Sequence, residues 1–471
     1  MAEGLVVPEK PGNAGGGKGP WFQRATQRRK GGTATGPWPS ISAISRICRG
    51  RYTARPSRSR QDRFYSLYDK VHRADILAHA YALSRANGGA AGVDGVTFGD
   101  IEASGREQFL KEVGAELRER RYRATAVRRV MIPKPGGGER PLGIPTIKDR
   151  VIQTAVKLVL EPIFEADLPE NAYGYRPERS AQEAVREVHG LLRAGHIHVV
   201  DADLSKYFDT IPQAEVLKCV ARRVADGAVL HLVKMWLTAP VEETDEDGRR
   251  RRRSSGNRGT PQGGVISPLL ANLYMRRFLL AWERWGIGSR LAARIVNYAD
   301  DFVILCRRGR DAFAARVEAQ RLLKRIGLTL NEAKTRVCQA GQEGFDFLGY
   351  AFGREHPFGG GMPYLAARPS RKSVQRYKDR VRALTLNSTT WQDETEMVGA
   401  VNRVTRGWVN YFRYGTKAKV FTRLERFLIV RLQAWLTHKH KVGTKGVSRY
   451  PPAYLWETLG VARVVAACDT R

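Results

Sequence analysis

The feature that most restricts the fold of this chain is an acidic pair enclosed by two apolar runs, in the stretch RIVNYADDFVILC at residues 294–306. The runs are rich in residues that favour β-strands and the polar interruption is short, so the stretch predicts a β-hairpin packed within a sheet. Asp300 and Asp301 would lie at the edge of that sheet, where two ionised carboxylates repel each other and lose hydration. A bound divalent cation would remove this penalty, whereas the plainer interpretation is a turn-forming pair with local hydrogen bonds.

A second apolar stretch, HIHVVDADLSKYFD at residues 196–209, also leads into acidic residues. Asp201 and Asp203 are two positions apart, so in a strand their side chains share one face. If the two strands are neighbours, three carboxylates from them would hold two Mg²⁺ ions, which prefer oxygen ligands, about 3.5–4 Å apart. Such a pair of ions activates the 3′-hydroxyl of a primer and stabilises the leaving pyrophosphate. The spacing alone leaves Asp201 and Asp203 both open as ligands.

The charge of the chain indicates the class of its partner. Lys and Arg number 80 against 47 Asp and Glu, which gives a formal net charge of +33 and a pI of about 10.4. A surface this positive favours a polyanion, and nucleic acid is the ordinary one. An anionic membrane is disfavoured, because no apolar run approaches the roughly 20 residues that a bilayer span needs. The five cysteines are scattered without a C-x-x-C pair, which argues against disulfides or structural zinc and favours a reducing intracellular compartment.

Composition and periodicity divide the chain into four regions. Residues 1–60 carry twelve Lys and Arg against two acids with no apolar period, which predicts a flexible basic arm. Residues 61–365 mix helical and strand patterns, and residues 366–437 carry helical patterns alone. Residues 438–471 are interpreted as a short basic tail, with a reduced DNA-binding region as the more specific interpretation.

Within these regions the periodicity predicts individual elements. Helices are expected over 62–86, 109–122, 149–168, 314–327, 373–385, 397–414 and 419–436, and strands within 127–145, 196–204 and 345–352. The charged stretch 241–259 is interpreted as a solvated hairpin loop between strands, and contact with a phosphate backbone is the alternative.

The amino-acid sequences of several blocks resemble those of a known family. YADD with its apolar flanks resembles the metal-binding hairpin of reverse transcriptases, and it is accompanied in order by VDGVT, PKPGGGERPLGIP, NAYGYRP, DADLSKYFDTI, TPQGGVISPLLANLYM, GLTLNEAKT, FDFLGY and RGWVNYFRYG. Together they resemble the reverse transcriptase/maturase proteins encoded by bacterial group II introns, over about residues 62–460. The resemblance implies an α+β fold: a right-hand polymerase, with fingers and palm built on antiparallel sheet, followed by an all-α basic thumb or maturase bundle.

The resemblance also assigns roles to individual positions. It implies metal binding by the carboxylates of Asp203, Asp300 and Asp301 and by the Leu204 carbonyl. Asp201 is interpreted as a neighbour of this site rather than a ligand. Nucleotide binding is implied for Lys134 and Arg140, which would clamp the triphosphate, and for the ring of Phe208, which would exclude a 2′-hydroxyl. It is also implied for the loop of Pro261, Gln262 and Gly263, which would contact the nucleotide sugar. A primer grip is implied for Phe347, Leu348, Gly349 and Tyr350, with core packing as the alternative. Contacts with RNA are expected from Arg406, Arg413 and Tyr414.

The function implied by the resemblance is that of an RNA-directed DNA polymerase. Such a protein binds its intron RNA as a ribonucleoprotein, assists splicing, and copies the intron into DNA at a DNA target, using two Mg²⁺ ions, dNTPs, an RNA template and a DNA primer, with no membrane partner. Many relatives carry a C-terminal nuclease with Cys pairs and His, which has no counterpart in these residues, so priming from an existing nick or replication strand is expected. Two alternatives stay open: a splicing cofactor with an inactive polymerase, and a domesticated reverse transcriptase in DNA repair or phage defence.

Overall fold

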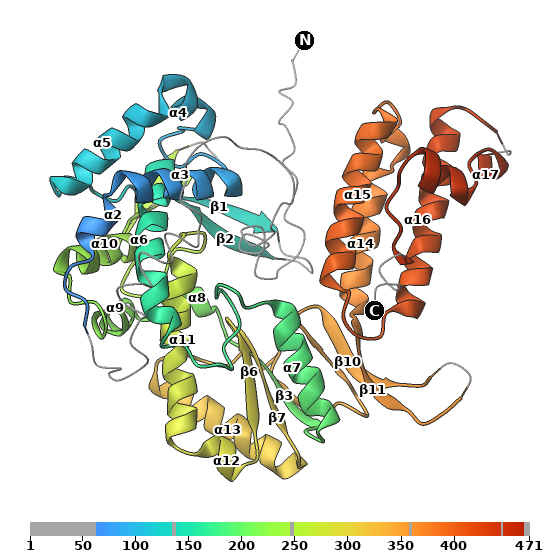
Figure 1. Ribbon diagram of the computed structural model, residues 1–471. Coiled ribbons are helices and arrows are strands. Elements are labelled where there is room, and N and C mark those ends of the chain that lie inside the picture. The colour runs from blue at the N-terminus through green and yellow to red at the C-terminus, as the bar shows by residue number, and fades with distance from the viewer. Residues whose placement is uncertain (1–62, 134–137, 245–248, 358–359, 444–445, 466–471) are drawn as a thin grey trace.

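The computed structural model describes residues 63–133, 138–244, 249–357, 360–443 and 446–465 (Figure 1). The basic arm expected over residues 1–60 and the predicted nucleotide contact Lys134 lie outside the described residues. Among the helices that are described, none is both long and apolar enough to cross a bilayer.

The palm is centred on an antiparallel sheet with the strand order β6-β7-β3-β8. Its strands are β3 (His198–Asp203), β6 (Arg294–Tyr298), β7 (Asp301–Cys306) and β8 (Arg336–Gln339). The predicted hairpin is therefore confirmed, and Tyr298 pairs with Asp301 across a two-residue loop. The first loop residue, Ala299, has a φ of +58°, and a positive φ at this position is what a type II′ hairpin turn requires.

The palm sheet separates two hydrophobic cores, which explains why β7 is apolar at every position after Asp301. Phe302, Ile304 and Cys306 face one core, and Val303 and Leu305 face the other. Successive side chains of a strand point to opposite faces, so a strand buried on both faces lacks the usual polar alternation. The first core includes α6 (Ile147–Glu165), α11 (Ser267–Arg284) and α13 (Gly309–Arg325), and the second includes α7 (Ala181–Arg193) and the thumb helices.

The fingers comprise the N-terminal helices and a mixed sheet with the order β2-β1-β4-β5 (Figure 1). These elements, with the helices between β3 and β4 that join them to the palm, are α2 (Tyr68–Val71), α3 (Ala74–Asn87), α4 (Phe98–Ser104), α5 (Arg106–Arg118), β1 (Val127–Pro133), β2 (Glu139–Ile144), α8 (Tyr207–Thr210), α9 (Gln213–Ala221), α10 (Gly227–Leu237), β4 (Val241–Thr244) and β5 (Arg250–Arg253). In the palm, the short helix α12 (Ile287–Arg290) joins α11 to β6. The antiparallel β4–β5 pair confirms the hairpin expected at 241–259.

The single helix expected over residues 62–86 is wrong, because the chain forms two helices there. Arg73 adopts an extended conformation (φ −64°, ψ 138°) between α2 and α3. Its guanidinium then pairs with Asp75 in the first turn of α3 at 2.8 Å. At the other end of α2, the Asp226 carboxylate accepts hydrogen bonds from the amides of Leu67 and Tyr68, both at 2.8 Å. Such long-range capping is invisible in a local apolar pattern.

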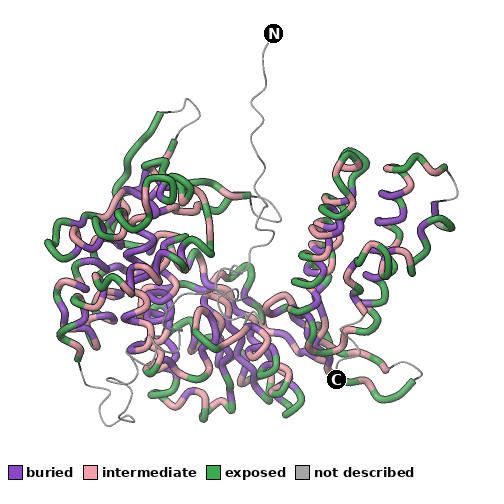
Figure 2. Tube along the Cα trace, turned by 45° about the horizontal axis from the view of Figure 1, so that its top comes forward, coloured by how far each residue is buried: buried purple, intermediate pink, exposed green. Residues whose placement is uncertain are grey.

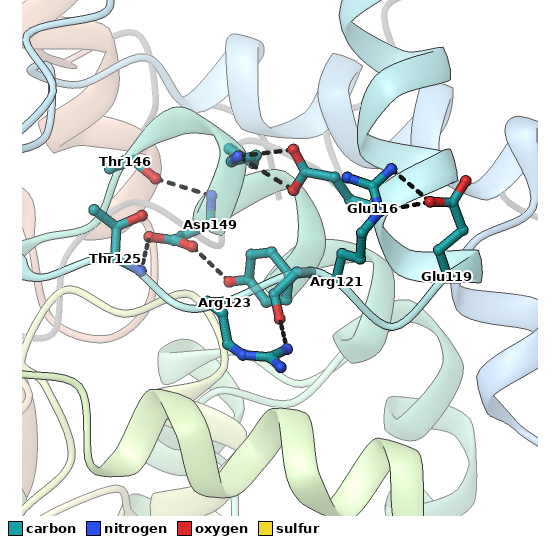
Figure 3. A network of polar contacts seen from close by, with 9 residues as sticks. Glu116, Glu119, Arg121, Arg123, Thr125, Thr146 and Asp149 are labelled. Carbon is teal, nitrogen blue, oxygen red and sulfur yellow. Dashed lines mark hydrogen bonds and ion pairs between the residues drawn. The ribbon is translucent and has the colours of Figure 1, made fainter.

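A buried polar network joins the fingers to α6 (Figure 3). The Asp149 carboxylate accepts a hydrogen bond from the Tyr122 hydroxyl at 2.5 Å and one from the Thr125 amide at 3.3 Å. The same tyrosine hydroxyl accepts from the indole of Trp236 at 2.8 Å. Burial raises the pKa of the Asp149 carboxyl above its ordinary value. The network therefore places an acidic group where only its hydrogen-bond partners replace water.

A second small sheet, with the order β11-β10-β9, leads from the palm into the thumb. It contains β9 (Phe345–Phe347), β10 (Tyr350–Glu355) and β11 (Tyr364–Pro369). Strand structure therefore continues to Pro369, beyond the predicted limit of 365. The physical reason is that β11 is held by its pairing with six residues of β10. Its buried residues are Ala366, Ala367 and Pro369, which do not give the alternating pattern of a typical strand.

The thumb is the helical bundle that the sequence predicts, and with it the right-hand architecture is confirmed. It contains α14 (Arg371–Leu384), the 3₁₀ turn η2 (Asn387–Thr389), α15 (Glu394–Tyr411), α16 (Ala418–Lys439), α17 (Gly446–Arg449) and the π-type turn η3 (Tyr454–Thr458). Tyr450, Leu455, Val461 and Val464 pack into the same core as these helices. Figure 2 shows buried residues continuing from the palm into the base of the bundle. A role of residues 438–471 in DNA binding stays a prediction.

Candidate active site

Three aspartates meet at one edge of the palm sheet. Asp203 ends β3, Asp301 begins β7, and the two are paired directly across the strands, while Asp300 occupies the hairpin loop. One carboxylate oxygen from each aspartate lies within 4.8 Å of the others, and all three residues are half-buried. The structure thus brings together the set that the sequence predicts. Three carboxylates this close repel one another strongly unless cations compensate them.

The Asp203 carboxylate has two partners from the loop before β8. The Lys334 ammonium lies 3.1 Å from Asp203 Oδ2, and the Asn331 side-chain amide donates to the same oxygen at 3.4 Å. The Asn331 backbone amide also donates to the Asp203 carbonyl at 2.8 Å. Both residues belong to the block GLTLNEAKT, and neither was predicted as a site residue. Their proximity could have been inferred only from the position of that block within the family.

These contacts indicate that the cluster suits a hard divalent cation. All of the candidate metal ligands in the cluster are carboxylate oxygens, the ligand type that Mg²⁺ prefers. The Lys334 side chain is 67% exposed, so it can swing into solvent if a cation takes its place beside Asp203. Leu204 forms a bridge with Leu330 directly beyond Asp203, which places its backbone near the cluster. Metal binding by the Leu204 carbonyl stays a prediction.

Asp201 lies on the same strand as Asp203 but has a different environment. Burial raises the pKa of its carboxyl to about 6, the positive charge of Arg336 opposes that effect, and the negative charges of Asp301 and Asp346 add to it. The Arg336 guanidinium lies 3.5 Å from Asp201 Oδ2. Asp201 is therefore engaged with a basic partner from β8, and its role as a neighbour of the metal site stays a prediction.

The residues predicted to contact a nucleotide occupy a junction between fingers and palm. Gln262 donates its side-chain amide to both Asp209 carboxylate oxygens at 3.2 Å, and its carbonyl accepts from the Gly143 amide at 2.5 Å. Gly263 has a φ of +111°, and a methyl group on it would collide with the Gly143 carbonyl oxygen. Strand β2 of the fingers and the Gln262 loop are thus in backbone contact, which only glycine permits. The adjacent Pro261 carbonyl accepts from the hydroxyl of Ser267 at 2.9 Å.

Phe208, the predicted selector of the sugar, is held by two aromatic rings. Tyr175 and Tyr207 contact it edge-on, with ring centroids 6.3 and 5.6 Å away. The Phe208 backbone carbonyl accepts a hydrogen bond from the Thr260 amide at 2.8 Å. This bond joins the backbone of Phe208 to the segment that carries Gln262. Arg140 is exposed on β2, which pairs with β1 in the fingers. A nucleotide role for these residues stays a prediction.

The predicted primer grip is the tight turn between β9 and β10. Phe347 and Tyr350 are buried, so the core-packing alternative holds for their rings. Leu348 and Gly349 form the turn, with φ values of +50° and +81°. The Tyr411 hydroxyl donates to the Leu348 carbonyl at 2.7 Å, and the Tyr350 hydroxyl donates to the Tyr411 carbonyl at 2.7 Å. The thumb therefore stabilises this turn directly.

The predicted RNA contacts divide into two kinds. Arg406 and Arg413 have exposed side chains on and just after α15. Tyr414 instead lies against α7, where its hydroxyl is 2.8 Å from His189 Nδ1 and the Arg186 guanidinium lies 5.6 Å from its ring centroid. Tyr414 thus contributes to the junction of palm and thumb, and contact of the three residues with RNA stays a prediction.

Comparisons with known proteins match both halves of this architecture. The family described as "Reverse transcriptase (RNA-dependent DNA polymerase)" matches residues 132–352, and "Group II intron, maturase-specific domain" matches residues 374–450. Protein YkfC of Escherichia coli (strain K12) is 32% identical over 348 residues, which cover 66% of this chain and 89% of that protein.

Other similarities are more partial. The group II intron-encoded protein LtrA of Lactococcus lactis subsp. cremoris is 33% identical over 214 residues, which cover 45% of this chain and 34% of that protein. This chain therefore matches about a third of the length of that relative. A solved partial Cas6-RT-Cas1–Cas2 complex is 25% identical over 55% of this chain and 42% of that chain, with a TM-score of 0.34, too low for a structural conclusion. With a reverse transcriptase domain that contains the three aspartates and a maturase-specific domain that forms the helical bundle, the chain belongs to the group II intron reverse transcriptase/maturase family.

Proposed function

We propose that this protein is encoded within a group II intron, binds that intron's RNA to assist its splicing, and copies it into DNA after insertion at a DNA target. The observation that carries the proposal is the combination of an intact aspartate cluster with a maturase-specific bundle in one chain. The second hydrophobic core contains residues of both the palm sheet and the thumb. Because the two parts share this core, an RNA held by the thumb stays in a fixed relation to the catalytic edge of the sheet.

The chemistry proposed for the site is transfer of a nucleotide to a primer 3′-hydroxyl. Asp203, Asp300 and Asp301 would hold the metal ions, proposed to be two Mg²⁺. When bound, such ions favour ionisation of the attacking hydroxyl and neutralise charge on the leaving pyrophosphate. The carboxylates keep a strongly negative edge that favours cations over free nucleotide in the absence of metal.

The selection of substrate is proposed to reside in the residues around this edge. The Phe208 ring, held edge-on by Tyr175 and Tyr207, would fill the space that a 2′-hydroxyl needs and so favour dNTPs. Gln262 would turn its amide from Asp209 toward the nucleotide sugar. Arg140 would supply charge-assisted hydrogen bonds to the triphosphate, and the same role is proposed for Lys134, which lies outside the described residues.

The basic surface of the thumb is proposed to bind RNA. Residues 371–450 contain eighteen Lys and Arg against five acids, and Arg406 and Arg413 are exposed. Cationic side chains of this kind bind phosphates regardless of sequence. We also place the protein in the bacterial cytoplasm beside the nucleoid. This location agrees with the three free thiols of the described cysteines, Cys219, Cys306 and Cys338.

The proposal is tested by purifying the protein from its native cells under mild conditions and sequencing the RNA that remains bound. One large structured RNA, excised from the transcript that encodes the protein, is the expected result. An Arg406→Ala, Arg413→Ala double variant should recover less of it. A mixture of unrelated RNAs would contradict the intron role and favour a reverse transcriptase of DNA repair or phage defence.

A further inference from the structure

The loop at residues 171–175 adds an extra strand-like contact to the free edge of the catalytic hairpin. Ala172 forms a parallel bridge with Asn297 of β6. The Tyr173 amide donates to the Asn297 carbonyl at 2.8 Å, and the Asn297 amide donates to the Asn171 carbonyl at 2.9 Å. This loop is part of the block NAYGYRP, to which the sequence analysis gave no role. In the structure it lies beside the turn that carries Asp300.

Gly174 of this loop has no room for a side chain. A Cβ atom at Gly174 would lie 2.5 Å from the Ala299 amide nitrogen and 3.0 Å from the Tyr298 carbonyl carbon. Both are backbone atoms of the catalytic turn, so neither can move unless the turn moves. The φ of Gly174 is not positive, so the position needs glycine for space rather than for an unusual backbone conformation.

Two buried asparagines hold the loop and the turn in this close contact. The Asn272 side-chain amide, on α11, donates to the Gly174 carbonyl at 2.5 Å. The Asn297 side-chain amide donates to the Ala299 carbonyl at 2.8 Å and to the Asp301 carbonyl at 3.4 Å. Asn272 is 5% exposed and Asn297 is 1% exposed, so these bonds have no competition from water. Hydrogen bonds of this kind fix the geometry of a turn.

We propose that Asn272, Gly174 and Asn297 form a clamp that fixes the catalytic turn, and that this clamp sets the affinity of the aspartate cluster for divalent metal ions. They are positioning residues, since they act through the backbone of Ala299 and Asp301. The inference rests on the proposed function in taking Asp203, Asp300 and Asp301 as the metal ligands.

The physical need for such a clamp comes from two forces that act against the turn. The three carboxylates repel one another, which favours a wider spacing. Ala299 has a positive φ, a conformation that is unfavourable for a residue with a Cβ. Mg²⁺ demands near-ideal octahedral geometry, so a relaxed turn binds it less well. The clamp opposes both forces through its contacts with the backbone of the turn.

The test is to measure Mn²⁺ binding to the purified full chain, without nucleic acid or nucleotide, by the loss of the free-ion signal in electron paramagnetic resonance. Gly174→Ala and Asn297→Ala should weaken Mn²⁺ binding by roughly ten- to a hundredfold, the usual effect of losing a group that orients metal ligands. Asn272→Ala is a further variant that leaves the hairpin sequence intact and should have the same effect. The folding of each variant is checked by its melting temperature.

Two matched controls separate positioning from general stability. Gly190→Ala, on α7, adds a methyl group that meets nothing within 4 Å. Asn402→Ala removes a side chain that, like Asn297, holds backbone atoms, at Gly460 (2.9 Å) and Ala462 (2.6 Å) in the thumb. Asn402→Ala should lower the melting temperature without weakening Mn²⁺ binding. Asp203→Asn identifies the fraction of bound Mn²⁺ that belongs to the catalytic site.

The outcomes distinguish the clamp from the function on which it rests. Wild-type affinity in Gly174→Ala, Asn297→Ala and Asn272→Ala would overturn the clamp while leaving the proposed metal site in place. An equal loss in Asn402→Ala would also overturn it, since the effect would then be one of stability. If Asp203→Asn removes none of the Mn²⁺ that the wild type binds, both proposals are overturned.

Discussion

Replacing Tyr411 by Phe should weaken the binding of a primer–template duplex, because it removes the hydroxyl that stabilises the predicted primer grip. That hydroxyl donates to the Leu348 carbonyl at 2.7 Å, in a turn where Leu348 has a φ of +50°. The left-handed conformation costs a leucine about 1–2 kcal/mol. The hydrogen bond from Tyr411 offsets this cost by about 1–2 kcal/mol, and the substitution removes that stabilisation. The Gly349 carbonyl keeps its hydrogen bonds from Ser370 and Ser373, so the turn loosens without unfolding.

If the whole free energy of the lost hydrogen bond appears as weaker duplex binding, the affinity for the duplex falls about 5- to 30-fold, since about 1.4 kcal/mol corresponds to a factor of ten. Fluorescence anisotropy with a labelled primer–template measures this directly, and the KM for dNTP should change little. Tyr377→Phe is the matched control, because its hydroxyl pairs with Thr405 at 3.0 Å entirely within the thumb. Unchanged duplex affinity in Tyr411→Phe, or equal weakening in Tyr377→Phe, would refute the reasoning.

Three further predictions concern the nucleotide junction and the fingers. Phe208→Ala should raise incorporation of rNTPs relative to dNTPs by about tenfold or more, because the ring that fills the 2′ position is gone; an unchanged ratio in single-nucleotide extension would exclude this role. Gly263→Ala should raise the KM for dNTP roughly tenfold, since the added methyl collides with the Gly143 carbonyl and moves the Gln262 loop; steady-state primer extension at varied dNTP checks it, and a wild-type KM would contradict it. Burial raises the pKa of Asp149, so the folded chain holds that proton more tightly than the unfolded chain and loses stability as pH rises above the ordinary value of 3.8. Asp149→Asn lacks this dependence, so the melting temperature of wild type relative to the variant should fall as the pH rises above about 4, and a constant difference would disprove it.

The parts of the fold that the sequence predicts are those with a strong local pattern. The hairpin of β6 and β7 is recognisable because both of its strands are apolar on each face, and the structure shows a core on either side of it. The three long thumb helices are recognisable because each has an apolar stripe with the period of an α-helix. The aspartate cluster follows from the hairpin, since adjacent carboxylates at the end of a buried strand are costly unless a cation compensates their charge.

Helix α7 was not predicted, although its N-terminus carries a recognisable signal. Ser180 and Glu183 form a capping box, with the Ser180 hydroxyl accepting from the Glu183 amide at 3.2 Å and the Glu183 carboxylate accepting from the Ser180 amide at 2.6 Å. The spacing S-x-x-E before an apolar periodic run is the usual sign of a helix start. This element could therefore have been found from the sequence alone.

Other features depend on contacts between distant segments and have no local signal. Gly174 has the appearance of an ordinary turn glycine, whereas its importance comes from the backbone of Ala299 packed against it. Lys334 reaches Asp203 from a loop far along the chain. The start of α2 is capped by Asp226, which also lies far along the chain. In each case the deciding partner lies outside any window that a periodic pattern covers.

The most direct test of the account is RNA-templated primer extension by the purified protein, compared with Asp300→Ala, with RNA binding measured on the same preparations. The wild type should incorporate dNTPs. The variant should lose roughly a thousandfold in rate, equivalent to the several kcal/mol that bound metal ions contribute, and should retain RNA binding. Undiminished extension by Asp300→Ala, or no extension by a wild-type protein that still binds RNA, would contradict the central claim that this aspartate cluster is the catalytic centre of a DNA polymerase.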